Sequence, residues 1–588
     1  MLCRSRALAR KKLSVLSTRS FSSKPTSLSV YKLGYSLGGL FLGGATVWAY
    51  SKFSSSESPK VTGTSIGQAD ASTRRLEDVG PPMYANDEEF QNCLKELRNF
   101  LSEDKLLTDK DDADTYADSS FNSHHAPKPD VQKPSAVVYP SSTDEVSKVL
   151  KILHKYRVPI VASSGFTSVE GHTLHLRGPN SVALSFEQMD QVVAVHPGDL
   201  DAVVQAGVGW QDLDEYLLSN DDTKHLMFGP DPGPGARIGG MVGTSCSGTN
   251  AYKYGTMKEN VINLTVVLAD GTIIKTRQRP RKTSAGYDLT RLFIGAEGTL
   301  GVVTEVTVRL SIRPIEEFVS MATFATVYDA CSAAEGLIQR GIGLNALEMI
   351  DSTMVSFVNR YAGLKDAQGN PREFIEKPTL LFKIGGPNQD AIRQQFGAVE
   401  EVCNSNNVLK IVQSKDENEN DVLWGARKNG LLSTLQYGSE VLPDKNDVQV
   451  WTTDIAVPIS ALATVISETD EDLQKEGLGD FYSTMGHIGD GNCHFIILFN
   501  SKDYKKIHAA VDRMVNRALN YEGTCTGEHG VGIGKRRYLV KELGTPAVDL
   551  MRNLKLLLDP RRILNPDKVV RLDPSDNVDE LVDQEGSH

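Results

Sequence analysis

The 588-residue sequence has few cysteines, and none of them forms a recognisable pair. Its seven cysteines are odd in number and widely scattered, without a Cys-x-x-Cys pattern. Neither a disulfide framework nor a thiolate zinc ribbon is therefore indicated. No internal repeat is visible either. With 40% apolar and 23% charged residues, the chain has the composition of an ordinary globular protein, and its length predicts roughly two to four domains.

Acidic residues are absent from the first 56 positions, which carry nine basic side chains. The remainder of the chain has 54 basic and 75 acidic residues, so its formal charge is −21, against −12 for the whole sequence. Nucleic-acid binding needs clustered lysine and arginine on the folded part to neutralise phosphates. The acidic body therefore argues against a nucleic-acid partner and leaves a basic protein partner open.

Residues 1–29 are rich in Arg and Ser and are interleaved with Leu, Val and Phe. This composition is typical of a mitochondrial transit peptide, with a disordered basic tail as the alternative. Residues 33–51 are 19 uncharged residues, just long enough to cross a bilayer as a helix, although five glycines leave a buried or interfacial segment open. The order of the two segments resembles a bipartite sorting signal. It predicts a protein of the inner mitochondrial membrane whose body faces the intermembrane space, with residues 53–84 as a linker.

Short apolar runs alternate with helical patterns from Pro134 onward. A strand-like AVVYP is followed by EVSKVLKILHKY at helical spacing and then by VPIVAS, which predicts a β-α-β opening. Later strand-like runs include a hairpin around Asp270-Gly271. We expect an α+β fold with one domain over residues 85–312, a second over 316–540, and a C-terminal segment over 541–588.

Three glycine-bearing segments, at residues 158–172, 230–256 and 294–306, adjoin apolar runs. Their exposed backbone N–H groups and hydroxyls can hold a pyrophosphate, and glycine lets the backbone approach a flat ligand because it has no Cβ. One such segment alone is more often just a turn, but the three together favour a dinucleotide. None matches the Gly-x-Gly-x-x-Gly of a Rossmann helix or a Walker loop. A Rossmann-type nicotinamide enzyme and a nucleotide-hydrolysing motor are therefore disfavoured.

Two histidines lie on strand-like runs on either side of Asp490-Gly491. If Asp490-Gly491 form a two-residue hairpin turn, His487 faces His494 on one side of the sheet, with Cβ atoms about 4.5–5.5 Å apart. Both imidazoles would then reach one divalent ion. A purely structural histidine pair is the competing interpretation.

A second cluster, Thr526-Gly527-Glu528-His529-Gly530-Val531-Gly532, presents a carboxylate and an imidazole on a glycine-rich backbone. Glu528 would complete a site of two histidines and one carboxylate with open positions for substrate, as a catalytic zinc or manganese requires. His529 would remain free to act as a base near neutral pH. A tight glycine turn with surface charges is the alternative.

The order of these motifs resembles the FAD-linked D-2-hydroxyacid dehydrogenase family, whose FAD-binding domain is of the vanillyl-alcohol oxidase type. The matching segments are Ile238-Gly239-Gly240-Met241, Tyr254-Gly255, Leu268-Ala269-Asp270-Gly271, Gly295-Ala296-Glu297-Gly298-Thr299-Leu300-Gly301 and Ile563-Leu564-Asn565-Pro566. The resemblance implies a two-subdomain FAD-binding domain over 85–312 and an α+β substrate or cap domain, with an antiparallel sheet and the metal site, over 316–540. It also implies that residues 541–588 return to the FAD domain.

The resemblance implies that FAD is held without a covalent bond, because the phosphate loop lacks the histidine that covalently linked members place there. Where the family usually has Gly-Gly-Thr-Ser, this chain has Gly165-Phe166-Thr167-Ser168. The residues expected to bind FAD are Ser164, Gly165, Thr167, Ser168, Gly171, Pro230, Gly239, Gly240, Thr244, Gly248, Tyr254, Gly255, Glu297, Gly301 and Val303.

The second region carries more specific marks of the family, His-x-Gly-Asp-Gly-Asn-x-His and Gly-Glu-His-Gly-x-Gly. There His487, His494 and Glu528 match metal ligands, and His529 matches the proton acceptor. Arg427 matches the arginine that holds the substrate carboxylate, a role that suits the forked donors of a guanidinium. Without the family, an exposed arginine on a helix surface is the alternative interpretation of Arg427.

The resemblance predicts oxidation of D-lactate to pyruvate, with the electrons passed from FAD to cytochrome c. The acidic body suits electrostatic steering of that basic partner. A D-2-hydroxyglutarate or glycolate dehydrogenase of the same family is the alternative among oxidoreductases. A metal-dependent hydrolase would leave the three glycine segments unexplained, and a membrane-tethered binding or assembly protein without activity is a third class.

Overall fold

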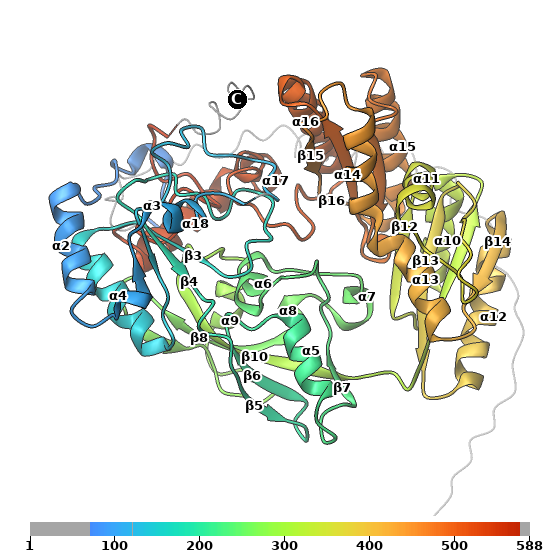
Figure 1. Cartoon of the computed structure of the whole chain (residues 1–588), viewed down its shortest axis with the longest axis horizontal. Coiled ribbons are helices and arrows are strands. Elements are labelled where there is room, and N and C mark those ends of the chain that lie inside the picture. The colour runs from blue at the N-terminus through green and yellow to red at the C-terminus, as the bar shows by residue number, and fades with distance from the viewer. Residues whose placement is uncertain (1–70, 120, 577–588) are drawn as a thin grey trace, which may run out of the picture. The chain divides into compact units, whose positions relative to one another are not determined.

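Three β-sheets form the framework of the part of the chain that this computed structural model describes, residues 71–576 without residue 120. The first two sheets use strands that precede Arg313, and the third uses strands between Glu316 and Phe499 (Figure 1). No helix within residues 71–576 is long and apolar enough to cross a membrane. The expected transit peptide, 1–29, and the expected anchor, 33–51, lie outside the described residues.

The first sheet consists of β1 (Leu106–Leu107), β2 (Ala136–Val138), β4 (Val182–Ser185) and β3 (Ile160–Ser163), in that order. β2 and β3 both pair with β4 in parallel, and α4 (Thr143–Tyr156) connects β2 to β3, which confirms the predicted β-α-β opening. α4 begins where the Ser142 side chain accepts a hydrogen bond from Glu145 N, and it ends at Arg157 in the left-handed conformation. α2 (Asp87–Leu97) packs beside α4.

The second sheet is antiparallel and lies next to the first along the chain. Its path is β5 (Val192–His196), β6 (Asp201–Gln205), β10 (Val302–Ile312), β8 (Val261–Val267) and β9 (Ile273–Lys275), and β7 (Leu226–Phe228) pairs with the end of β10. β8 and β9 form the predicted hairpin, with Gly271 at φ 83° in its turn. Its helices are α5 (Trp210–Leu218), α6 (Ile238–Thr244), α7 (Ala251–Tyr254), α8 (Met257–Asn260) and α9 (Leu289–Phe293).

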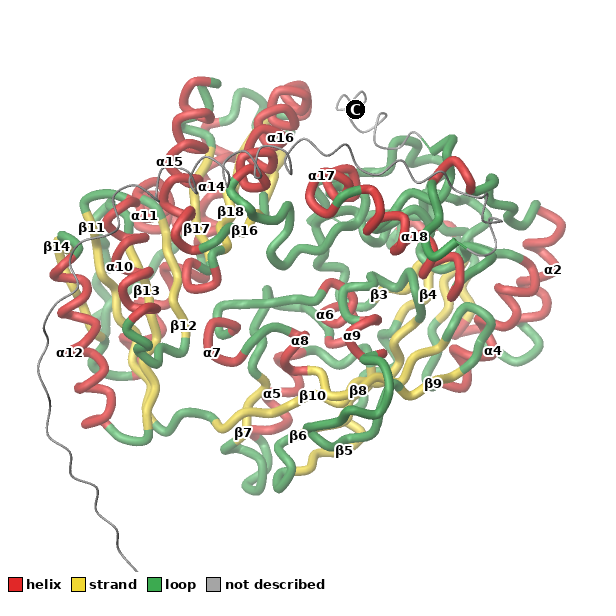
Figure 2. The backbone as a smooth tube through the Cα atoms, turned by 180° about the vertical axis from the view of Figure 1, so that it is seen from behind, coloured by secondary structure: helices red, strands yellow, loops and turns green. Residues whose placement is uncertain are grey.

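The third sheet has eight strands, and its seven-strand path runs β14 (Val408–Gln413), β11 (Glu316–Phe324), β13 (Thr379–Gly386), β12 (Ala346–Ile350), β17 (Tyr482–Gly486), β18 (Asn492–Phe499) and β15 (Gln449–Thr452). All of its pairs are antiparallel, and β16 (Ile455–Ala456) joins β18 at the side. Figure 2 shows this sheet from behind with helices on both of its sides.

Two apolar cores cover the two faces of the third sheet. One core contains side chains of α10 (Val327–Gln339), α12 (Gln389–Ser405), α15 (Ile459–Lys475) and α16 (Tyr504–Asn520). The other contains side chains of α11 (Ser352–Tyr361) and α13 (Glu417–Lys428), with α14 (Gly430–Val441) beside them. Side chains alternate along each strand, so Leu347 and Met349 enter the first core, whereas Ala346 and Ile350 enter the second. Glu348 shares the face of Ala346 and Ile350.

The end of the chain packs on the first sheet. After η6 (Arg536–Tyr538), α17 (Leu539–Leu543) and α18 (Thr545–Leu558), the buried Ile563 and Leu564 enter the core of that sheet, and Ile160 N donates to Ile563 O at 2.8 Å. α18 ends before Asp559, as predicted. Residues 71–84 lie against this segment: Arg552 donates to Arg74 O, and Arg562 donates to Gly80 O.

Candidate active site

His487, His494 and Glu528 meet beside β17 and β18. His487 follows β17, His494 lies on β18, and Glu528 belongs to the loop between α16 and η6. Glu528 Oε1 is 2.9 Å from His487 Nε2 and 3.3 Å from His494 Nε2. The potential ligand atoms of the three side chains all lie within 4.8 Å of one another. The fold therefore brings together the three residues that the sequence predicts to hold a metal.

The turn between the two histidines differs from the predicted two-residue hairpin. Met485, rather than His487, lies opposite His494 in the β17–β18 ladder. A short 3-10 turn, η4 (Ile488–Asp490), closes on Gly491 at φ 75°, so the turn is longer than Asp490-Gly491. The predicted register is therefore wrong by two residues. Because strand side chains alternate with a period of two, this shift preserves the face, and the two rings still meet, with centroids 5.5 Å apart.

Glu348 fixes the orientation of both a candidate metal ligand and the candidate substrate arginine. Its Oε1 is 2.8 Å from His487 Nδ1, and its Oε2 accepts from Arg427 Nε at 2.8 Å. The side chain is 1% exposed. A hydrogen bond to the second ring nitrogen sets the tautomer and the direction of a metal-binding histidine. Sequence reasoning missed Glu348, whose one signal is a single carboxylate in the apolar run Ala346–Ile350.

The fully buried Asp454 holds the loop that carries Glu528 and His529. Its Oδ2 accepts hydrogen bonds from the backbone N–H groups of Gly527, Glu528 and His529 at 2.8–2.9 Å. Burial opposes ionisation of this carboxyl, but its interactions with the basic side chains of His529 and then Lys535 outweigh burial and hold the pKa of Asp454 well below its ordinary value. Sequence reasoning also missed Asp454. An ionised carboxylate thus fixes the backbone beneath both candidate catalytic side chains.

His529 stacks against His494. The ring centroids are 5.1 Å apart and the planes are 10° from parallel. Nδ1 of His529 is 3.9 Å from Glu170 Oε1, and the side chain is 17% exposed. Burial lowers the pKa of His529 from its ordinary value. The ring is therefore close to the candidate metal ligands and disposed to be neutral, as a proton acceptor must be.

Arg427 is largely buried rather than exposed on a helix surface. It lies in the last turn of α13, and its side chain is 12% exposed. Its Nε is bound to Glu348, and no described residue is a hydrogen-bond partner of its two terminal nitrogens. A guanidinium fixed in this way can present both terminal N–H groups to a carboxylate.

Behind His529 lies a buried ionic cluster that sequence reasoning missed. Glu170 is 3.1 Å from Lys535 Nζ and 3.2 Å from His124 Nε2, and its side chain is 1% exposed. Burial opposes the charge, but Lys535 and His124 outweigh it and lower the pKa of Glu170 to about 2. Ile533 N donates to Glu170 O at 2.9 Å, so the cluster also anchors the glycine-rich loop.

We expect Glu170→Gln to make the stability less sensitive to acid. Because the pKa is lowered from 4.5 to about 2 in the folded state, the ionised carboxylate stabilises the fold fully above pH 4.5, and this contribution is lost as the pH falls from 4.5 to about 2. The shift corresponds to on the order of 3 kcal/mol. Urea unfolding near pH 7 and near pH 3 measures it, with the exposed Glu471→Gln as control. An unchanged pH dependence in Glu170→Gln would contradict the assignment.

The three glycine segments lie side by side around α6. Gly165 is so close to the second segment that a Cβ on it would lie 2.5 Å from Gly235 O. From the third segment, Gly295 N donates to Val242 O at 2.9 Å. Glu297 then connects this arrangement to the loop that carries Glu528 and His529, because its carboxylate accepts from Val531 N and Gly532 N at 2.6 and 2.9 Å. The glycine segments and the Gly-Glu-His-Gly loop thus form one continuous region.

The residues predicted to bind the cofactor fall into three groups. Gly239, Gly240 and Thr244 belong to α6; Ser164, Gly165 and Thr167 lie beside it or beside the residues that lead into it, and Glu297 N donates to Gly243 O, while Ser168 follows Thr167 in the same loop. A second group, Pro230, Gly248, Tyr254 and Gly255, lies at the ends of the 230–256 segment, where Gly248 packs on Asp231 and Tyr254 on Gly229. In the third group, a Cβ on Gly171 would meet Ile533, one on Gly301 would meet Val266, and Val303 pairs with Val266 in the sheet.

Phe166 occupies a backbone position that favours glycine. Its φ is 55°, in the left-handed region, which accounts for the glycine that the family usually has there. The ring packs edge-on against Tyr116, with centroids 5.2 Å apart, in a small apolar cluster with Val137 and Ala183. The side chain is therefore accommodated by the face of the first sheet.

Polar atoms around α6 fit a polar ligand. Among the described residues, Ser168 Oγ, Tyr254 OH and His172 Nδ1 are buried without a hydrogen-bond partner, whereas His172 Nε2 lies 3.4 Å from Glu297 Oε1. Buried polar groups normally have partners, so these atoms are suited to the hydroxyl, carbonyl and phosphate groups of a dinucleotide. The close approach of Gly165 to Gly235 holds two of the predicted cofactor segments together.

Gly165→Ala should weaken FAD binding. The new Cβ would meet a backbone oxygen at 2.5 Å, so one of two cofactor segments must move. Overpacking of this kind costs about 1–3 kcal/mol, equivalent to roughly five- to 150-fold weaker binding. Flavin absorbance per purified chain measures it. Gly198→Ala is the control, because a Cβ there meets nothing within 4 Å. Wild-type flavin affinity in Gly165→Ala would contradict the location of the site.

Known families and solved structures match this arrangement. Residues 134–277 match the FAD binding domain model, and residues 313–569 match the model of FAD linked oxidases, C-terminal domain. The 4-ethylphenol oxidase from Gulosibacter chungangensis has a TM-score of 0.66 at 18% identity, covering 84% of this chain and 99% of that chain. p-Cresol methylhydroxylase has a TM-score of 0.64 at 17% identity, with the same coverage. The fold is therefore that of the vanillyl-alcohol oxidase type of flavoprotein, with an α+β cap domain, as predicted.

Proteins with similar sequences identify the family of flavoproteins more closely. The mitochondrial D-lactate dehydrogenase (cytochrome) of Kluyveromyces lactis is 47% identical over 92% of this chain and 90% of its own. The corresponding protein 1 of Saccharomyces cerevisiae is 45% identical over 86% of this chain and 84% of its own. The chain belongs to the FAD-linked D-2-hydroxyacid dehydrogenase family. It is an FAD-dependent oxidoreductase, which confirms the predicted family and the prediction of FAD.

Proposed function

We propose that the protein oxidises D-lactate to pyruvate in mitochondria and passes the electrons through FAD to cytochrome c. This proposal rests on one observation. Arg427, His529 and the candidate metal ligands lie together and adjoin the glycine segments. These elements are joined by direct contacts, through Glu348 on one side and Glu297 on the other. The names and high identity of the two yeast relatives support the substrate and the acceptor.

Arg427 would bind the substrate carboxylate. Glu348 holds its Nε at 2.8 Å, which directs the terminal nitrogens and keeps a buried cation neutralised. The same carboxylate holds His487 at 2.8 Å, so the position of the bound carboxylate is fixed relative to the histidine group. In a 2-hydroxy acid, the hydroxyl is on the carbon next to the carboxylate. This short separation suits a site in which Glu348 joins the carboxylate-binding Arg427 to His487.

His529 would accept the hydroxyl proton. Its imidazole stacks on His494 at 5.1 Å and its backbone N–H is bound to Asp454, so the ring is held beside the hydroxyl-binding region. Glu170 and Lys535 lie on its other side. Oxidation of the alcohol removes two electrons and two protons, and His529 takes the proton from oxygen.

FAD, held without a covalent bond by the glycine segments, supplies the two-electron acceptor for the hydrogen on Cα. His487, His494 and Glu528 would hold a divalent zinc or manganese ion, which supplies a Lewis acid for the substrate hydroxyl. The donor set fits such an ion, because both imidazoles point their Nε2 atoms at Glu528 while their Nδ1 atoms are bound to Glu348 and Thr453 O.

We propose that the N-terminal segments determine where the protein lies in the cell. Residues 1–29 would direct the chain to mitochondria, and residues 33–51 would tether it to the inner membrane with its body in the intermembrane space. Complete release of the protein by carbonate extraction would remove the tether from the proposal.

Cytochrome c reduction by D-lactate should slow as ionic strength rises. The body carries 54 basic and 75 acidic residues, and a basic partner is steered by such a charge at low salt. Initial rates at several salt concentrations measure the effect, with a small uncharged electron acceptor as control. Rates with cytochrome c that are independent of salt would contradict the steering.

D-2-Hydroxyglutarate and glycolate in the same assay test the choice of substrate. Faster turnover of either acid would overturn D-lactate as the preferred substrate.

A further inference from the structure

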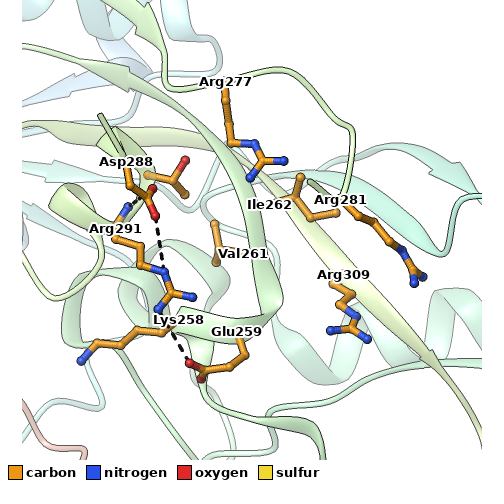
Figure 3. A pocket seen from close by; sticks show the side chains of 10 residues that line it. Lys258, Glu259, Val261, Ile262, Arg277, Arg281, Asp288, Arg291 and Arg309 are labelled. Carbon is orange, nitrogen blue, oxygen red and sulfur yellow. Dashed lines mark hydrogen bonds and ion pairs between the residues drawn. The ribbon is translucent and has the colours of Figure 1, made fainter. Parts of the chain in front are cut away.

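A cationic pocket lies on the second sheet, away from the candidate active site. Its volume is about 260 Å³, and α8, β8, α9, β10 and the loop after β9 line it (Figure 3). Five of its lining side chains are cations: Lys258, Arg277, Arg281, Arg291 and Arg309. Along β10, Arg309 is six residues from Val303, or roughly 20 Å at the rise of a strand. Arg309 therefore lies well away from the 294–306 segment, whereas Glu259, at another edge of the pocket, packs on Gly255 of the 230–256 segment.

The positive charge of the pocket is only partly neutralised. Arg291 lies 3.5 Å from Asp288 and 3.8 Å from Glu259, the two carboxylates of the lining, as the dashed lines in Figure 3 mark. Within residues 71–576, Lys258, Arg281 and Arg309 have no carboxylate within ion-pair distance. Clustered like charges repel, so an anion bound among them would stabilise the arrangement.

The sequence beside the pocket is basic, although the body as a whole is acidic. Residues 275–282 contain five basic residues and no acidic one. Arg279 of this run is paired with Asp199 and Asp201, whereas Arg277 and Arg281 line the pocket. Beside the pocket residue Asp288, Tyr287 is 94% exposed and Leu289 is 39% exposed. An exposed aromatic ring and an aliphatic side chain beside a cationic pocket suit a ligand that carries both charge and apolar groups.

We propose that this pocket binds a phosphate group, either the phosphodiester of an anionic lipid or free inorganic phosphate. Arginine forks bind phosphate oxygens in pairs, which a point charge does not do. The volume is below the ~300–1,000 Å³ of pockets that enclose drug-sized ligands, so it fits a single phosphate group rather than a whole nucleotide.

Calorimetric titration of the full-length, flavin-loaded protein tests the proposal. The probes are inorganic phosphate, dihexanoylphosphatidylglycerol and, as a phosphodiester without net charge, dihexanoylphosphatidylcholine. Short chains keep the lipids soluble, so membrane insertion by another part of the protein does not contribute. We expect binding of at least one of the first two probes and at least tenfold weaker binding in the double variant Arg281→Ser, Arg309→Ser. Lys282→Ser, which removes a neighbouring charge that does not line the pocket, should change the affinity less than twofold.

Binding of dihexanoylphosphatidylglycerol alone would assign the pocket to a lipid headgroup, and binding of phosphate alone would assign it to the free ion. The flavin spectrum and the unfolding midpoint of the double variant should match those of the wild type. Absence of binding by both anionic probes, or equal affinity in the wild type and the double variant, would overturn the proposal.

Discussion

His529→Asn should lower the rate of D-lactate oxidation by about a hundredfold or more while leaving FAD in place. A positioned general base contributes about 10²–10⁴-fold, and asparagine cannot accept the hydroxyl proton. His529 does not belong to the glycine segments, and Asp454 holds its backbone N–H, which the substitution retains. The rate of flavin reduction in single-turnover mixing with D-lactate measures the loss directly.

The matched control is His225→Asn, which removes an exposed histidine immediately before β7. Its flavin content and reduction rate should equal those of the wild type. The KM for D-lactate should change little in His529→Asn, because Arg427 still binds the carboxylate. A reduction rate within a few-fold of the wild type would show that another group takes the proton.

Glu528→Gln should abolish tight metal binding and lower D-lactate oxidation by roughly a hundredfold. The side chain lies 2.9 Å from His487 Nε2 and 3.3 Å from His494 Nε2, and an amide is a poor ligand in the place of a carboxylate. Loss of a Lewis acid costs several kcal/mol of stabilisation of the developing oxyanion. Elemental analysis of the purified protein and steady-state rates measure the two effects.

Glu471→Gln, an exposed carboxylate of a surface pair, is the control for Glu528→Gln. Chelator treatment of the wild type should reproduce the loss, and addition of zinc or manganese should restore it and identify the ion. A fully active wild-type protein that contains no divalent metal would contradict the assignment of His487, His494 and Glu528.

The parts of the site that are contiguous in sequence were predictable. The glycine segments, the two histidines and the Glu528-His529 pair each lie in a short motif whose chemistry can be read locally. The register of the β17–β18 turn was not predictable in this way, because a three-residue 3-10 turn and a two-residue turn have the same glycine and aspartate signal. The histidines met nevertheless, since a shift of two residues preserves the strand face.

The contacts that the supporting carboxylates make could not be found from the sequence, although Glu297 itself was predicted as a cofactor residue. Glu348 is 139 residues from His487, Asp454 is 74 residues from Glu528, and Glu297 is 234 residues from Val531. Short sequence motifs do not predict contacts between residues so far apart in the chain. These contacts depend on the pairing order of the third sheet and on the return of the chain to the FAD domain. An isolated carboxylate in an apolar strand, as at Glu348, is the one sequence feature that pointed to a buried partner.

Anaerobic addition of D-lactate to the purified full-length protein, followed by its visible spectrum, tests the central claim most directly. We predict flavin absorption bands in the protein as isolated, bleaching of these bands by D-lactate, and no bleaching by L-lactate. A colourless protein, bands that D-lactate leaves unchanged, or equal bleaching by both enantiomers would contradict the account.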